Sequence, residues 1–219
     1  MVSLQFVETP IGDGLGLEMA KLPGDDEGDA LLVAQRKVEA VADARCSKVV
    51  FVENIPSVQD QGRFFEFKVE ACLTGFIPGL AVGFSSVDPT GDGFPVPRRA
   101  CELDETVMIG YVGKVYADSG NKSFPIKWNP GRSVVARGHD RIGCLLTPKG
   151  EIVVFQNKEE VVRWSSKKDK VDISGLMNTD KLYGVVDVYG GTQRIKLNPA
   201  ANIVSPTDDP EDGAEEEGG

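Results

Sequence analysis

Histidine is the side chain that enzymes most often use as a general base near neutral pH, and this chain contains one, His139. It lies in the polar run Arg137-Gly138-His139-Asp140-Arg141, and the sequence has no GxSxG motif. A general base needs a nucleophile or an acid within reach, and no paired-carboxylate motif supplies one. Serine, lysine or aspartate chemistry stays open from the sequence alone. The pattern favours a loop residue at the start of a strand, and a protein that is not an enzyme.

Two further segments have the composition of ligand-binding loops but lack essential parts. Asp88-Pro89-Thr90-Gly91-Asp92-Gly93 places oxygen ligands at a spacing of two, as a calcium loop does, but the twelfth position is Arg99 instead of a glutamate. The segment Ile11–Met19 is rich in glycine but does not have the GxGxxG spacing of a dinucleotide-binding turn, so we expect a flexible loop there.

The cysteines do not form a metal-binding pattern either. Cys46, Cys72, Cys101 and Cys144 are 26, 29 and 43 residues apart, without a CxxC pair. This spacing excludes a zinc finger or a RING domain. We expect free thiols, with Cys72 and Cys144 buried as small apolar side chains, and we expect no metal ion and no cofactor.

Arginine and aromatic side chains in proline-rich loops are typical of surfaces that bind other proteins. Arg98 and Arg99 follow Pro97, and Trp128 lies in the proline-bounded segment Phe124–Pro130. Two interpretations stay open for Trp128, namely a core side chain, which is favoured, and an interface anchor. The arginines would bind carboxylates, and the aromatic rings would supply buried area. The candidate partner-binding residues are Arg98, Arg99, Tyr111, Trp128 and Arg132.

Composition and charge limit the function further. The chain has 219 residues and a formal net charge of −10, with 34 acidic and 24 basic residues. Many of the acids lie between Asp208 and Glu217, so the body is close to neutral and offers no broad basic surface for nucleic acid. No apolar run is long enough to span a membrane, and the start of the chain does not resemble a signal peptide. We therefore expect a cytoplasmic protein, with association with the cytoskeleton as an alternative.

Short runs rich in Val, Ile, Phe and Tyr, separated by 25 glycines and 13 prolines, predict an all-β protein built as a sandwich of two antiparallel sheets. Turn residues at Thr147–Gly150 and Tyr189–Thr192 predict hairpins. Residues 30–44 have the propensity and periodicity of a helix. The expected strands are Val2–Glu8, Lys48–Glu53, Arg63–Leu73, Leu80–Ser85, Glu105–Val112, Arg141–Leu146, Glu151–Gln156, Glu160–Trp164, Leu182–Tyr189 and Thr192–Leu197.

Several of these runs resemble, in order, the strands of the Neuralized homology repeat, a relative of the SPRY domain. Leu182–Gly190 reads LYGVVDVYG and is similar to that family's LYxVVDVYG strand. Gly110–Tyr116 and Gly138–Leu146 are closer to the SPRY domain, in which a GDxIGCxxD strand is followed by a hairpin and an FxxNG turn. Here His139 is inserted into the Gly-Asp pair, and Lys158 stands where the turn has glycine. The other segments that match the Neuralized repeat are Lys48–Glu53, Gly62–Val69, Gly79–Pro89 and Thr192–Leu197.

The resemblance covers roughly residues 28–198 and implies a bent antiparallel β-sandwich that recognises a protein or peptide through rim loops. It also favours strands over a helix in residues 30–44. Family members often carry a RING ligase domain, which this chain lacks, so ligase activity is not implied. Asp187 and Tyr189 of the matching strand are expected to be structural, with Val186 and Val188 facing the core and the Tyr189 hydroxyl fixing a neighbouring loop.

The expected organisation is an N-terminal strand and acidic loop at residues 1–27, a Neuralized-like sandwich at 28–199 and a disordered acidic tail at 200–219. Three kinds of function stay open. The first is a non-enzymatic interaction module, the second is a structural component of a larger cytoskeletal or ciliary assembly, and the third is a carbohydrate-binding or hydrolytic sandwich. The third would require convergent carboxylates in a cleft.

Overall fold

The computed structural model of the chain describes residues 5–6, 15–20, 31–36, 48–53, 55, 57–58, 60–72, 78–90, 94, 97, 99–130 and 140–198. Most of these residues lie in antiparallel strands, as predicted. The helical segments among them are one turn long: η2 (Ala100–Glu102), α2 (Ser166–Asp169) and α3 (Ser174–Met177). None of the described helices is long and apolar enough to cross a membrane.

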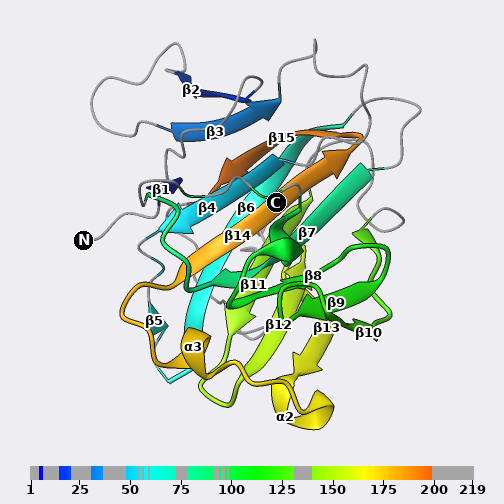
Figure 1. Cartoon of the computed structure of the whole chain (residues 1–219). Coiled ribbons are helices and arrows are strands. Elements are labelled where there is room, and N and C mark those ends of the chain that lie inside the picture. Colours follow the sequence, from blue (N-terminus) through cyan, green and yellow to red (C-terminus); the bar gives the residue numbers. More distant parts are fainter. Residues whose placement is uncertain are drawn as a thin grey trace, which may run out of the picture.

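The strands form two layers, and Figure 1 shows β14 of one sheet passing in front of β6 of the other. The first sheet has seven described strands, in the spatial order β1 (Gln5–Phe6), β4 (Lys48–Glu53), β14 (Tyr183–Gly190), β7 (Pro78–Ser85), β8 (Thr106–Ile109), β9 (Lys114–Ala117) and β10 (Lys122–Pro125). The second follows the order β13 (Glu159–Ser165), β12 (Glu151–Gln156), β11 (Arg141–Leu146), β6 (Gly62–Cys72), β15 (Thr192–Leu197), β3 (Leu31–Arg36) and β2 (Leu15–Ala20), with β5 (Ser57–Val58) paired to β6.

The main core lies between the two sheets and follows from the alternation of the strands. Phe65 and Phe67 of β6 and Val186 and Val188 of β14 all belong to this core, as the sequence predicted for the two valines. The rings of Phe65 and Phe84 meet edge to face, with centroids 5.5 Å apart. Burying a side chain of this size contributes about 1.5–3 kcal/mol, so this layer supplies much of the stability.

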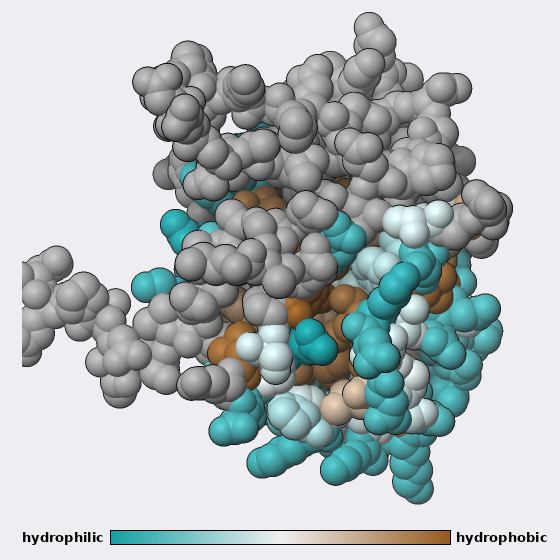
Figure 2. Space-filling model, turned by 90° about the vertical axis from the view of Figure 1, so that its left-hand side faces the viewer, coloured by the Kyte–Doolittle hydropathy of each residue, from teal (hydrophilic) through white to brown (hydrophobic). Residues whose placement is uncertain are grey.

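Apolar side chains are visible between polar ones on one side of the molecule (Figure 2). Figure 2 shows the side that is on the left in Figure 1, where apolar side chains gather in the middle between polar ones. β4 lies toward this side and carries the buried side chains Val50 and Val52, which belong to the core between the sheets.

Two segments near the start of the chain have a secondary structure that differs from the one their local sequence predicts. Leu15–Ala20 was expected to be a flexible loop, and it forms the edge strand β2, paired with β3. Its glycines obscured the alternation Leu15, Leu17, Met19. Leu31–Arg36 has helix-forming residues but forms strand β3, because it pairs with β2 on one side and with β15 on the other. Residues 37–44 lie outside the described part.

The predicted hairpin at Tyr189–Thr192 is wrong. β14 belongs to the first sheet and β15 to the second, so the chain crosses between the layers at Gly190 and Gly191. Gly190 has a φ of +57°, which glycine adopts without strain. The other predicted turn is confirmed, since the Gly150 amide donates to the Thr147 carbonyl at 3.0 Å between β11 and β12.

The segment expected as one strand, Glu105–Val112, is shorter in the structure. β8 ends at Ile109, and Gly110 and Gly113, with φ of +127° and +74°, begin and end a turn that leads into β9. The short strands β9 and β10 were not predicted. The first part of the expected loop Phe124–Pro130 therefore belongs to β10.

Candidate functional site

The structure places the predicted partner-binding residues in different surroundings. Arg98 and Arg132 lie outside the described residues. Arg99 precedes η2 at the surface, where its guanidinium Nε lies 3.1 Å from Glu102 Oε1 and the side chain is about half exposed. This ion pair raises the pKa of Arg99 further, so the residue carries its charge at any physiological pH. Its contact with a partner stays a prediction.

The two predicted aromatic anchors lie in the interior. Tyr111 is 5% exposed and stacks on Tyr189 with ring centroids 5.5 Å apart. Trp128 is 4% exposed, belongs to the core between the sheets and donates from Nε1 to Gln156 Oε1 at 3.2 Å. Neither ring is exposed at the surface, so both side chains have a structural role. Direct contact of either ring with a partner stays a prediction.

The outer face of the seven-stranded sheet carries a second apolar cluster instead of open solvent. Tyr111 belongs to it, together with Cys101 and Leu103 from the segment that follows Arg99. At its centre is Asp187 of β14, whose side chain is fully buried. Asp187 Oδ2 accepts hydrogen bonds from the Ala100 amide at 2.9 Å and from the Tyr111 hydroxyl. One carboxylate therefore fastens the loop of residues 99–105 to the sheet.

The aromatic hydroxyls of this cluster are kept neutral by their surroundings. Burial raises the pKa of Tyr111 far above its usual value, and the charge of Asp187 adds to the effect. Burial also raises the pKa of Tyr189 to about 12, and the charge of Asp187 adds to the effect, while the nearby backbone of Val112 and Leu80 opposes it. Asp187 thus fixes the loop of residues 99–105, whereas the expected role of the Tyr189 hydroxyl in fixing a neighbouring loop stays a prediction.

The second half of the same loop carries two carboxylates whose orientation is set by hydroxyl groups. Ser119 Oγ donates to Asp104 Oδ1, and Ser86 Oγ donates to Glu105 Oε2. Glu105 has a φ of +43°, an uncommon conformation for a residue with a side chain. Positions that strain the backbone in this way occur more often at binding and catalytic sites than elsewhere, which makes this loop a candidate for function.

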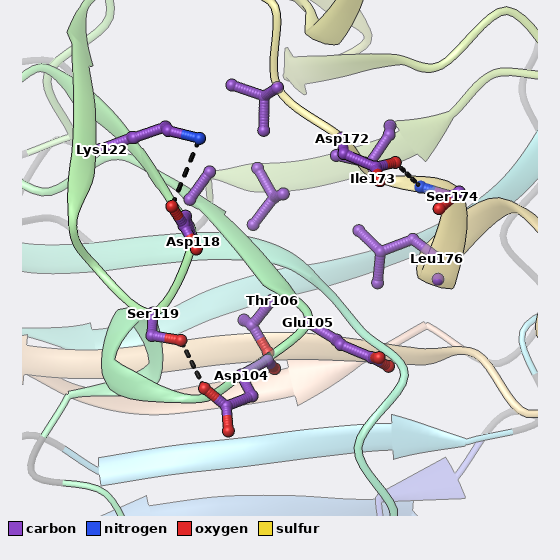
Figure 3. A pocket seen from close by; sticks show the side chains of 14 residues that line it. Asp104, Glu105, Thr106, Asp118, Ser119, Lys122, Asp172, Ile173, Ser174 and Leu176 are labelled. Carbon is purple, nitrogen blue, oxygen red and sulfur yellow. Dashed lines mark hydrogen bonds and ion pairs between the residues drawn. The ribbon is translucent and has the colours of Figure 1, made fainter.

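These two carboxylates stand at the edge of a cleft of about 360 Å³. The turn after β9 closes one side and the segment that leads into α3 closes the other, as Figure 3 shows. Its polar rim has Asp104, Glu105, Asp118 and Asp172, with Lys122 as the one ammonium group among the residues lining it. The apolar part is lined by Val107, Ala117, Val171, Ile173 and Leu176.

Short contacts hold the rim of the cleft in place. Lys122 Nζ lies 3.3 Å from Asp118 Oδ2, and the Ser174 amide donates to Asp172 Oδ1 at 2.9 Å. The latter bond lowers the pKa of Asp172, so this group is a carboxylate at neutral pH. A glycosidase needs one carboxylic acid with a raised pKa, and the shift at Asp172 has the opposite direction. With four carboxylates and one ammonium group among its lining residues, the cleft is negatively charged and suits a cationic ligand.

Helix α3 is surrounded by hollows. Besides the cleft, hollows of about 230 and 240 Å³ adjoin it, and the cleft shares Leu176 with the former and Ile173 with the latter. Pro148 lines both of the smaller hollows. Three adjoining hollows thus lie at this end of the sandwich, where loops of both sheets meet.

Sequence reasoning missed this site because its parts are far apart along the chain. Asp104 precedes β8, which was predicted with other bounds, and Asp118 follows β9, which was not predicted. Asp172 comes from a segment with no strong pattern. The available signal was the pair Asp104-Glu105 directly before an apolar strand. Without the strand order, nothing in the sequence brings Asp172 to the same place.

The comparison with protein families shows to which family the chain belongs. The family model described as Neuralized matches residues 28–198, so the chain belongs to the Neuralized family, and the resemblance seen in the sequence is confirmed. No curated protein matches it.

Solved structures support the same fold. The crystal structure of the Drosophila melanogaster Neuralized NHR1 domain superposes with a TM-score of 0.53 at 16% identity, covering 90% of this chain and 99% of that one. The solution structure of the NHR domain in Neuralized from the same organism gives 0.51 at 16% identity, covering 90% and 92%. The crystal structure of a mutant form of the Emp46p carbohydrate recognition domain gives 0.41 at 10% identity, covering 91% and 89%.

Proposed function

We propose that this domain is a non-enzymatic module that binds an exposed segment of a partner protein through the loops at the α3 end of the sandwich. Membership of the Neuralized family supports a protein-interaction role in general. The observation that supports this particular surface is the cleft of about 360 Å³ bordered by the loop of residues 99–105. That loop is fixed by the buried Asp187, so the binding surface is formed before a partner arrives.

The lining of the cleft defines the chemistry of the partner. A lysine or arginine side chain has an apolar stem and a cationic end. The stem would lie on Val171, Ile173 and Leu176, and the cation would meet the carboxylates of Asp104 and Asp118. Charge-assisted hydrogen bonds of this kind contribute about 1.5–3 kcal/mol each. The partner segment therefore carries a basic side chain.

The predicted arginines would bind the same segment at an adjoining position. Arg99 stands at the start of the loop whose end borders the cleft, and its side chain is half exposed. Replacing Arg98 and Arg99 together with alanine should weaken partner binding by roughly 1–4 kcal/mol and leave the fold intact. A partner segment in which an acidic residue follows a basic one would bind both the carboxylates of the cleft and the arginines at the start of the loop.

A displayed library of random linear peptides tests this proposal without a known partner. The wild-type domain should enrich sequences with lysine or arginine, and Asp104→Asn with Asp118→Asn should lose this enrichment. Asp180→Asn is the matched control, because Asp180 is exposed and does not line the cleft. Thermal melts of each variant confirm folding. Equal enrichment of basic peptides by the cleft variant and the control would contradict the proposal.

Two alternatives give different results in simple experiments. A structural subunit of a cytoskeletal or ciliary assembly would co-purify with a polymer in fixed stoichiometry, whereas an adaptor exchanges its partner. A carbohydrate-binding or hydrolytic domain would bind or cleave oligosaccharides. For the proposed adaptor we infer a cytoplasmic location, which fractionation of cells that express a tagged chain would test.

A further inference from the structure

Val112 is an unusual residue for the place where it lies. Its side chain is 77% exposed, and it is the one large hydrophobic residue that is exposed in the described ranges. Its φ is +52°, in the left-handed region that favours glycine or asparagine. A β-branched residue is the least suited to this conformation, and burial of the side chain within this chain does not compensate for the strain. The fold therefore gains nothing from a valine at this position.

The turn around Val112 is nonetheless held firmly. The Gly110 amide donates to the Lys114 carbonyl at 3.0 Å, and the Ile126 amide donates to the Gly113 carbonyl at 2.9 Å. A strained conformation persists only where its surroundings impose it, and these contacts do so. The turn therefore presents an apolar side chain in a fixed position.

Two lysines belong to the segments that form the turn around Val112. Lys114 follows in the chain, and Lys127 adjoins the turn because Gly113 packs beside the Ile126 carbonyl. Both lysines are exposed, and neither forms an ion pair with another described residue. A partner that covers Val112 would bring its own carboxylates to these two ammonium groups.

We propose that Val112 is the apolar anchor of a second contact surface, which binds an acidic protein segment that covers its side chain. This proposal rests on the proposed role in protein recognition but uses a different surface. β8 begins at Thr106, which lines the cleft, and ends at Ile109, directly before the turn. The two surfaces therefore lie at opposite ends of one strand. A lipid surface is less suitable as the partner, because a single valine has too little apolar area to anchor a domain there.

The same peptide library tests the second surface with different variants. The wild-type domain should also enrich peptides in which an apolar residue is flanked by Asp or Glu. Val112→Asn suits the left-handed conformation, so it should keep the fold while it weakens binding of such peptides about tenfold. Lys114→Glu with Lys127→Glu should weaken the same peptides. Lys149→Glu with Lys168→Glu is the charge-matched control, because both lysines are exposed, one in the β11–β12 turn and the other in α2.

The outcomes separate the two proposals. Loss of acidic peptides with Val112→Asn, while basic peptides are retained, supports the second surface, and the cleft variants should give the reverse pattern. Equal selection by the wild-type domain and Val112→Asn would overturn the assignment of Val112. A further experiment is sedimentation with phosphatidylserine vesicles. If the domain binds the vesicles through Val112 and does not enrich acidic peptides, the turn contacts a membrane instead of a protein.

Val112→Gly should unfold at a higher denaturant concentration than the wild type, and a lower midpoint would show that the valine serves the fold.

Discussion

The hydroxyl of Tyr111 donates a hydrogen bond to the buried carboxylate of Asp187, which lies 76 residues further along the chain. The same oxygen accepts the Ala100 amide at 2.9 Å. A central strand, the loop that borders the cleft and the turn that carries Val112 are thereby joined at one side chain. Both proposed contact surfaces depend on this junction for their position, although Asp187 itself is buried.

Removal of the Asp187 carboxylate should destabilise the domain more than removal of one of its donors. Asp187→Ala leaves the Tyr111 hydroxyl and the Ala100 amide buried without an acceptor, and we expect a loss of about 2–4 kcal/mol in the free energy of unfolding. Tyr111→Phe removes a single donor and should cost about 1–2 kcal/mol. Urea denaturation of both variants measures these losses. A loss for Asp187→Ala no larger than that for Tyr111→Phe would show that the carboxylate does not join the loop to the sheet.

Alkaline pH should destabilise the domain through its tyrosines. Burial raises the pKa of Tyr111 well above its usual value, and raises those of Tyr183 and Tyr189 to about 12. Because the pKa of each tyrosine is higher in the folded than in the unfolded state, the folded protein holds the phenolic proton more tightly. The free energy of unfolding is therefore unaffected by the titration of these groups below the unfolded pKa of about 10 and falls as the pH rises above it. Each such tyrosine steepens the decline by up to about 1.4 kcal/mol per pH unit.

Tyr111→Phe provides the control for this pH dependence. Its free energy of unfolding should fall less steeply than that of the wild type between about pH 9.5 and about pH 11.5, because one of the three protons is no longer retained on folding. Urea melts at several pH values give both slopes. Parallel declines would mean that Tyr111 is accessible to solvent in the folded protein.

The turn between β12 and β13 should become more stable when Lys158 is replaced by glycine. Asn157 and Lys158 have φ of +54° and +71°, the pattern of a two-residue hairpin turn that favours Asn-Gly. Relief of the strain outweighs the greater flexibility of glycine in the unfolded chain, so we expect a gain of about 0.5–1 kcal/mol. Lys158→Ala keeps the strain and serves as the control in parallel thermal melts. No advantage of the glycine variant over the alanine variant would contradict this account.

The sequence sufficed for those strands whose pattern is set by local alternation and by burial. Lys48–Glu53, Arg141–Leu146 and Thr192–Leu197 have the bounds that were predicted, because each alternates or is buried on both faces and is bounded by turn residues. The sequence did not suffice where pairing with neighbouring strands determines the secondary structure. Leu31–Arg36 is a strand because β2 and β15 lie on both sides of it, whereas its residues alone favour a helix.

The candidate site was harder to predict than the fold. The surface position of Arg99 agrees with its place in a proline-rich loop, and its role in binding stays a prediction. Asp187 was correctly interpreted as structural, but its partners, Ala100 and Tyr111, are distant in sequence, so the bond to the loop of residues 99–105 could not be inferred. The cleft depends on the same kind of long-range contact.

Trp128→Ala separates a core role from a surface role for the largest side chain in the predicted binding loop. The ring is 4% exposed within the core between the sheets, and its Nε1 donates to Gln156 Oε1 at 3.2 Å. We therefore expect the substitution to cost roughly 3–5 kcal/mol of unfolding free energy, the range for loss of a large buried ring. Denaturant melts measure this cost, and Trp128→Phe, which keeps most of the volume, should lose clearly less. A domain that keeps its stability while losing an enriched peptide would instead place Trp128 in the interface.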